Sequence, residues 1–421
     1  MIKKYIHLAT ASLLLSSGLV WAEEADIESR LAVAEARLAN LERVQQDSGG
    51  IADRLTINGF VSWSAARTNT IRNEAGERLE FDGWNTVLDH GPATRAGIQF
   101  DAQVNEQTGV FLQLLSRGSD DFDVEAQWAY LSYDFTPDIT GRAGRMVLPF
   151  YMHSQYSRVG YAYPWVQLPM EVYRMVDMDA HEGIDLTWRT HTGPVGHDLN
   201  VYLSSMNVES EAVPEPYIVR DMHGVNLRSR YGDWSTWLGY TNARVSLDLS
   251  DMVGSLGGDF SLDRDSAIFL SSGIQYDNGR VLLMAERNQL SIDNEGDWCP
   301  ELNGMYVMAG YRIGRAMPHL TWGRIGHGGL SEADEFAPGA GVLYRSIASR
   351  HESWTLGMRY DLLPGVALKL EASVYDDYGS ERKQLPGFFS NPDPANPMDP
   401  TNAIPASDDP MVFRFAVDAV F

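Results

Sequence analysis

Segments of about ten residues in which apolar and polar side chains alternate recur throughout residues 55–421. In residues 96–104, for example, every even position is apolar, while Gln99 and Asp101 lie between them. A period of two is typical of a β-strand with one apolar and one polar face. Ten residues also match a tilted strand that crosses a membrane. The pattern therefore predicts an all-β chain of long strands.

The connections between these segments alternate in length. Short turns are predicted near 105–108, 136–138, 192–196, 231–234, 277–279, 314–317 and 362–365. Long loops are predicted near 70–92, 116–124, 148–181, 207–221, 244–265, 291–303, 327–350 and 377–410. Seven turns and eight loops join sixteen strands, so that both ends of the barrel sequence lie on the short-turn side. Outer-membrane barrels have short periplasmic turns and longer extracellular loops.

The last segment, residues 411–421, predicts how these strands are arranged. Its odd positions are all apolar, and its even positions include Arg414 and Asp418. A strand this apolar with a free edge promotes aggregation. A closed sheet has no edge and satisfies every backbone group within lipid. We therefore expect this strand to pair with the first one, near 55–65, and to close a transmembrane antiparallel β-barrel of about 16 strands.

Residues 1–22 have the features of a secretory signal peptide. Lys3 and Lys4 precede an apolar stretch, residues 8–20, and "VWA" at 20–22 resembles a cleavage site. The apolar stretch is too short to act as a membrane anchor. The single cysteine, Cys299, excludes an internal disulfide. The barrel pattern and the signal together predict location in the outer membrane of a Gram-negative bacterium.

Residues 23–50 form the only clear helical pattern, followed by the barrel in residues 51–421. Apolar side chains occupy heptad positions a and d, with acidic and basic residues at e and g. These apolar positions are Ile27, Leu31, Ala34, Leu38 and Leu41. We expect a periplasmic coiled coil that joins copies of the chain. The alternatives are a single helix packed on its own domain and a helix that grips another envelope component.

The loop at 148–181 is long, rich in aromatic residues and stiffened by three prolines. A loop of this length is usually functional or disordered, and its aromatic content disfavours disorder. We expect it to fold inward and narrow the barrel, or alternatively to form an outer cap or subunit contact. The side chains expected at the constriction are Tyr156, Arg158, Arg174, Asp177 and Asp179.

Sixteen strands leave room for water and solutes inside a barrel. The polar side chains that alternation turns toward this interior are Arg95, Asp101, Arg142, Arg189, Arg228, Arg230, Arg312, Arg359, Lys369, Glu371, Arg414 and Asp418. The arginines and the lysine form a basic track for carboxylates or phosphates, which the acids partly neutralise. We therefore expect a pore for small hydrophilic solutes with a weak preference for anions. The formal net charge of −24 argues against a nucleic-acid partner.

No pattern of residues indicates an enzyme, a cofactor or a metal site. "HEGID" at 181–185 lacks the second histidine of a metalloprotease motif, and the ten histidines form no helical i, i+4 pair. A barrel lipase would need a Ser/His pair at one rim, which alternation neither excludes nor suggests. The main alternative is an outer-membrane anchor for adhesion or envelope tethering without significant transport. The strand count disfavours it, because an anchor needs only about eight strands.

In combination, these features resemble the Gram-negative trimeric porins. The heptad helix before the barrel resembles the DcaP-like subset, and "GRAGRMVLPF" at 141–150 resembles the passage from strand to third loop in such porins. "FRFAVDAVF" at 413–421 is similar to the signal that the barrel-assembly machinery reads during insertion. The resemblance implies a homotrimer surrounded by outer-membrane lipid that takes up small, often anionic, solutes.

Overall fold

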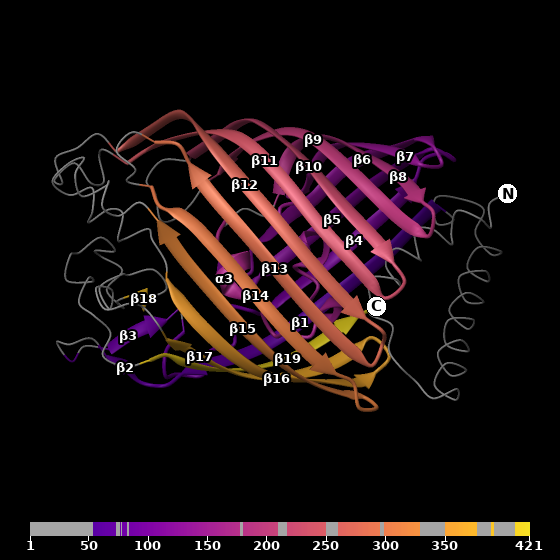
Figure 1. Cartoon of the computed structure of the whole chain (residues 1–421). Coiled ribbons are helices and arrows are strands. Elements are labelled where there is room, and N and C mark those ends of the chain that lie inside the picture. Colours follow the sequence, from indigo (N-terminus) through magenta and orange to yellow (C-terminus); the bar gives the residue numbers. More distant parts are fainter. Residues whose placement is uncertain are drawn as a thin grey trace.

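Sixteen strands close into one antiparallel barrel in the computed structural model of the chain (Figure 1). The structure describes residues 54–72, 76, 78–81, 84–176, 180–208, 217–249, 260–294, 299–328, 350–376, 389–390 and 409–421. The predicted signal peptide and coiled-coil helix lie outside these residues. No helix in the described part of the chain is long and apolar enough to cross a lipid bilayer.

The barrel strands follow the chain in order. They are β1 (Leu55–Thr68), β4 (Arg95–Gln103), β5 (Thr108–Arg117), β6 (Val124–Thr136), β7 (Ile139–Val147), β8 (Ala180–Thr192), β9 (Val195–Val208), β10 (Tyr217–Tyr231), β11 (Trp234–Asp248), β12 (Ser261–Asp277), β13 (Val281–Ile292), β14 (Glu301–Tyr311), β15 (Ala316–Gly328), β16 (His351–Leu363), β17 (Val366–Asp376) and β19 (Met411–Val420). A small sheet of β2 (Ile71–Arg72), β3 (Arg78–Phe81) and β18 (Phe389–Ser390) lies at the long-loop end, on the left of Figure 1. A short 3-10 helix, η2 (Gly118–Asp120), joins β5 to β6.

The first and last strands close the barrel. β1 and β19 pair antiparallel, with Trp63 opposite Val417. The backbone N–H of Phe421 donates to the carbonyl of Gly59 at 3.0 Å, and the N–H of Gly59 donates to the carbonyl of Phe421 at 2.9 Å. The predicted all-β class, sixteen-strand barrel and closure by the last strand are confirmed.

All seven short turns lie where alternation places them, and they gather at one end of the barrel (Figure 1). Two of them contain Gly193 and Gly232, whose φ angles are 58° and 55°. This left-handed region favours glycine because glycine has no Cβ. Local turn chemistry therefore fixes the connections and, through them, the order of the strands.

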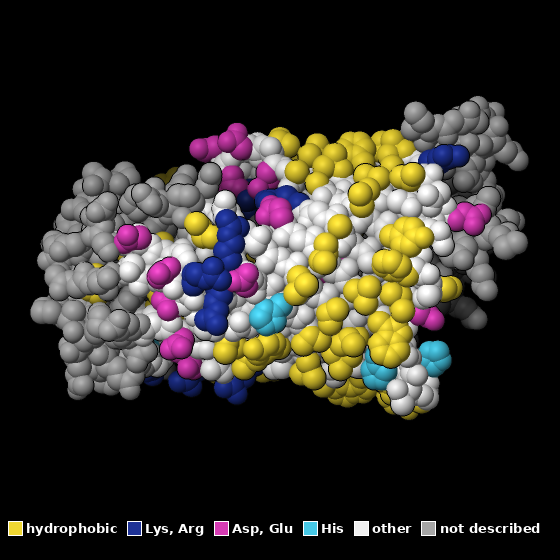
Figure 2. All heavy atoms as spheres, turned by 90° about the horizontal axis from the view of Figure 1, so that it is seen from above, with side chains coloured by type: hydrophobic (Ala, Val, Ile, Leu, Met, Phe, Trp, Pro, Cys, Tyr) yellow, Lys and Arg dark blue, Asp and Glu magenta, His cyan; other side chains and the backbone are white. Residues whose placement is uncertain are grey.

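The outer face of the barrel is apolar over a broad band, which Figure 2 shows on the face seen from above. On β16, outward Trp354 and Leu356 are 51% and 64% exposed, whereas His351 and Ser353 are buried on the inner face. Soluble monomers seldom expose an apolar surface larger than a few hundred Å². The band is the surface that strand alternation predicts for contact with lipid.

Candidate functional site in the barrel interior

The loop that joins β7 to β8 lies inside the barrel, where α3 (Met170–Tyr173) is visible between the strands in Figure 1. The loop also contains η3 (Ser154–Tyr156) and η4 (Gly160–Ala162). Its buried apolar side chains form one cluster with inward-facing side chains of β9 to β15. The cluster contains Leu148, Phe150, Tyr151, Tyr163, Trp165, Leu168, Val172 and Val176 of the loop and Tyr202, Met206, Val219, Met222, Ala243, Phe269, Leu282, Met284, Tyr306, Met308 and Met317 of the strands.

The apolar cluster seats the loop firmly on the inner wall. Trp165 is 1% exposed and Val172 is fully buried. Each large apolar side chain buried in this way contributes about 1.5–3 kcal/mol. The indole N–H of Trp165 also donates to Thr321 Oγ1 at 2.8 Å, so its polar edge is satisfied. A cavity of about 20 Å³ between loop and wall, beside Gln167, has room for roughly one water.

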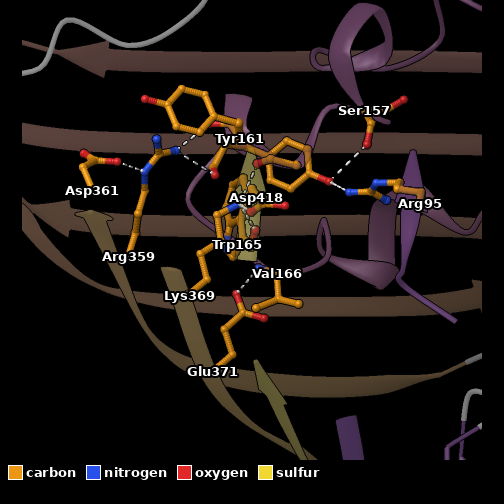
Figure 3. Close-up of polar contacts among 12 residues, drawn as sticks. Arg95, Ser157, Tyr161, Trp165, Val166, Arg359, Asp361, Lys369, Glu371 and Asp418 are labelled. Atoms are coloured by element: carbon orange, nitrogen blue, oxygen red, sulfur yellow. Dashed lines mark hydrogen bonds and ion pairs between the residues drawn. The ribbon is translucent and has the colours of Figure 1, made fainter. Parts of the chain in front are cut away.

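Charged side chains from the wall bind the backbone of the loop (Figure 3). Lys369 Nζ donates to the carbonyls of Gly160 at 2.6 Å and Trp165 at 2.7 Å, and lies 2.7 Å from the carboxylate of Asp418. Glu371 Oε1 accepts the backbone N–H of Val166 at 3.0 Å. Lys369 and Asp418 are both buried. Each charge is therefore paired or hydrogen-bonded, as burial in a low dielectric requires.

Arginines from three other strands hold further parts of the loop. Arg359 on β16 donates to the carbonyls of Tyr161 at 2.7 Å and Tyr163 at 3.1 Å. Arg95 on β4 donates to the hydroxyl of Tyr163. Arg228 on β10 donates to the carbonyl of Met152 at 2.6 Å. Because β4 and β10 lie far apart around the barrel, these tethers hold the loop across the interior.

Two buried glutamates complete the attachment. Glu286 on β13 accepts the backbone N–H of Met152 at 2.9 Å and the hydroxyl of Tyr173 at 2.6 Å. Glu171, in α3, lies 3.2 Å from His351 Nε2 and accepts the hydroxyl of Ser353. Burial alone raises the pKa of Glu171, but the contacts with His351 and Ser353 outweigh it and lower the pKa. Glu171 is thus held as a carboxylate inside the barrel.

The loop also has a buried histidine. Burial, together with the positive charge of Arg228, lowers the pKa of His153 to about 3. Its Nδ1 lies 2.5 Å from the hydroxyl of Tyr156, and its Nε2 lies 3.3 Å from the hydroxyl of Tyr306. His153 is therefore neutral at physiological pH and joins two hydrogen-bonded tyrosines.

A second apolar cluster contacts the loop from the long-loop end of the barrel. It consists of Ala66, Ile71, Phe81, Trp84, Ala93, Met170, Tyr375 and Val412. Ile71, Phe81 and Trp84 belong to the connection between β1 and β4, and Met170 belongs to α3. This connection therefore folds over the barrel mouth far enough to contact the interior loop.

The inner wall of β6 to β10 also carries charged side chains that pair with other side chains of the wall. Arg142 Nε lies 3.0 Å from Asp185 Oδ1, and the Arg142 guanidinium lies 5.3 Å from the ring of Tyr130. Arg230, whose side chain is 54% exposed, pairs with Asp198. These ion pairs give this part of the inner wall a polar surface beside the apolar cluster.

The structure places the twelve predicted lining residues on inward-facing positions, in three groups with different contacts. Arg95, Arg228, Arg359, Lys369 and Glu371 contact the loop backbone or its tyrosines. Asp418 pairs with Lys369, and Arg414 donates to Ser373 Oγ at 3.0 Å and to Tyr375 Oη at 3.1 Å. Asp101, Arg142, Arg189, Arg230 and Arg312 pair with wall side chains instead. Their part in solute passage stays a prediction.

Three of the five predicted constriction residues are described. Tyr156 and Arg158 are partly exposed, and Arg174 is exposed. Asp177 and Asp179 lie outside the described residues. Sequence reasoning missed Glu171, Glu286 and His351 as anchors of the loop. One sequence feature could have indicated these anchors, namely an acidic residue or a histidine at an inward position of an apolar strand. Glu286 in "LLMAERN" at 282–288 is an example.

Solved structures with the same fold include several porins. DcaP, an outer membrane channel of Acinetobacter baumannii, is 11% identical with a TM-score of 0.55, over 87% of this chain and 97% of that chain. An anion-selective porin of Comamonas acidovorans is 13% identical with a TM-score of 0.54, over 87% and 99%. OmpF of Salmonella typhi, in complex with daunomycin, is 14% identical with a TM-score of 0.53, over 87% and 97%. No family model and no curated protein matches the sequence.

Proposed function

We propose that this chain, whose barrel has the fold of bacterial outer-membrane porins, is a porin through which small hydrophilic solutes diffuse passively across the Gram-negative outer membrane. The observation that carries the proposal is the closed sixteen-strand barrel with an apolar outside and a polar inner wall facing a docked loop. Passive diffusion needs no catalytic group, so the chain acts without enzymatic chemistry or a cofactor.

The apolar band is the surface in contact with outer-membrane lipid. Outward aromatic side chains such as Trp188, Tyr240 and Tyr360 are exposed, as in the aromatic girdles of membrane barrels. The short turns then face the periplasm and the long loops face the outside. The barrel-assembly machinery inserts the chain. Three copies associate, with the helix of residues 23–50 as a periplasmic coiled coil.

The loop sets the width of the solute path, and the charged side chains on the wall beside the loop set its ion selectivity. Solutes pass along the polar wall of β6 to β10, where Arg142, Arg189 and Arg230 alternate with Asp185 and Asp198. Arg230 and Arg189 are exposed, whereas the two aspartates are more buried. Exposed arginine side chains on a wall whose acidic side chains are more buried attract anions such as carboxylates. We therefore propose a weak anion preference.

Planar-bilayer recordings with the purified full-length protein test this function. We expect stable current steps in groups of three. In a salt gradient, we expect a reversal potential whose sign shows that anions are more permeant than cations. Arg189→Gln/Arg230→Gln should shift the reversal potential toward cation preference, whereas the same change at outward-facing Arg145→Gln/Arg324→Gln should leave it unchanged. A protein that gives no channel current would favour the alternative of an outer-membrane anchor. A clear cation preference in the wild type would refute the proposed anion selectivity.

A further inference from the structure

Three arginines lie side by side on the outside of the barrel. Arg220 on β10 pairs with Arg244 on β11, and Arg264 follows on β12. All three are exposed. Figure 2 shows a column of basic side chains between the apolar band and the long-loop end. We call Arg220, Arg244 and Arg264 the outer arginine patch.

Only one of the three arginines of the patch has an ion-pair partner in the described part of the chain. Arg264 pairs with Asp221 at 2.6 Å, with both side chains 65% exposed. Within the described part of the chain, neither Arg220 nor Arg244 forms an ion pair. Like charges directly opposite each other on adjacent strands are destabilising. In a chain with a net charge of −24, two adjacent arginines without an ion pair point to an anionic partner.

The backbone on both sides of β11 is bulged at this position. β10 has an extra residue between Arg220 and His223, and β12 has one between Leu262 and Asp265. Asp221 and Arg264, at these bulges, have φ angles of 51° and 61°. A non-glycine residue in the left-handed region is unfavourable, and bulges often serve to re-aim a side chain. Here the two bulges direct both side chains outward, where they meet across β11.

The position of the patch relative to the apolar band identifies the partner. Toward the short-turn end, His223 and Asn242 come first, next to Leu203. Beyond them the outward side chains are apolar and exposed, including Leu238 and Leu270. Asp248 and Asp263 lie on the opposite side, nearer to the long loops. The patch therefore lies where the hydrocarbon region ends. At that depth, arginine guanidinium groups meet lipid headgroups, and their planar fork suits the oxygens of a phosphate.

We propose that the outer arginine patch binds the phosphorylated sugar headgroup of the glycolipid in the outer leaflet. The inference rests on the proposed outer-membrane location, with the long loops outside. Arg220 and Arg244 hold one phosphate between them, and Arg264 contributes from the next strand. Salt weakens the contact, because these charges are solvent-exposed.

Native mass spectrometry of the full-length protein in detergent tests the proposal, with purified bis-phosphorylated lipid A as probe. The variant Arg220→Gln/Arg244→Gln/Arg264→Gln should weaken binding by about tenfold or more. The control Arg54→Gln/Arg280→Gln/Arg315→Gln removes the same charge from exposed sites at the short-turn end, and we expect it to retain wild-type binding. The patch variant and the wild type should bind dephosphorylated lipid A with equal affinity.

Two results would overturn the proposal. One is equal binding of lipid A by the patch variant and the control variant. The other is a changed oligomeric state of the patch variant, by light scattering, with unchanged lipid binding, because the patch would then join copies of the chain. Bilayer conductance separates the two proposals. If the wild type gives no channel current but the patch mutations still weaken lipid A binding, only the pore is refuted. If the protein conducts but the patch mutations leave lipid A binding unchanged, only the glycolipid site is refuted.

Discussion

At the scale of single residues, buried ionisable groups of the interior loop are matched to specific partners. Glu171 combines complete burial with contacts to His351 and Ser353. Removing the carboxylate leaves both partners without an acceptor at the same place. An unsatisfied buried polar group costs more than the hydrogen bond itself contributes.

Glu171→Ala should weaken docking of the loop by about 1–3 kcal/mol for each partner left unsatisfied. In single-channel recordings we expect a noisier open-state current, because α3 loses its polar attachment to β16. Glu106→Ala, at an exposed turn, is the matched control. Indistinguishable current noise in the two variants would mean that Glu171 does not hold the loop.

His153 predicts a dependence of stability on pH. Its pKa is about 3 in the folded protein, because of burial and Arg228, and about 6.5 in an unfolded chain. Between these two pH values, the unfolded chain binds a proton at His153 that the folded chain does not bind. The free energy of unfolding is therefore highest above pH 6.5 and decreases as the pH falls toward 3. Melting temperatures of wild type and His153→Gln in detergent, measured from pH 8 to 4, should decline more steeply in the wild type. Parallel curves would contradict this assignment.

At the scale of elements, close approach between the loop and the wall depends on inward glycines. A Cβ on Gly304 of β14 would lie 2.0 Å from the backbone oxygen of Glu171. Gly326 lies on the outer face of β15, and a Cβ there would meet nothing within 4 Å. The loop backbone therefore rests directly on β14 at this point, and only a residue without a side chain fits.

Gly304→Ala should displace α3 and destabilise the protein by about 1–3 kcal/mol, the usual cost of overpacking. We also expect an altered single-channel conductance, because α3 moves within the interior. Gly326→Ala should behave as wild type in both measurements. A Gly304→Ala variant with wild-type conductance and denaturant midpoint would disprove the close contact.

At the scale of the whole molecule, the buried pair Lys369 and Asp418 joins three parts of the structure. Lys369 lies on β17 and Asp418 on the closing strand β19, and Lys369 also binds two carbonyls of the loop. Removal of one partner of a buried ion pair leaves an uncompensated charge and costs about 3–5 kcal/mol. The pair therefore couples barrel closure to loop docking.

Lys369→Met should lower the free energy of unfolding by about 3–5 kcal/mol, measured by urea titration in detergent micelles. Lys369→Met/Asp418→Asn should recover part of that loss, since it removes the unpaired carboxylate. A double variant no more stable than the single one would argue against coupling through the ion pair.

The sequence by itself determined the strand count, the turn positions, the closing pair and the face of each predicted lining residue. These properties follow from local physics, because a period of two assigns the faces and turn residues set the connections. Only the tertiary structure decided which inward side chains bind the loop. Trp165 and Thr321 are 156 residues apart in the chain, and no local pattern relates them. The same contacts explain why β13 is apolar on both faces: Leu282 and Met284 pack against the loop, and Leu283 faces outward.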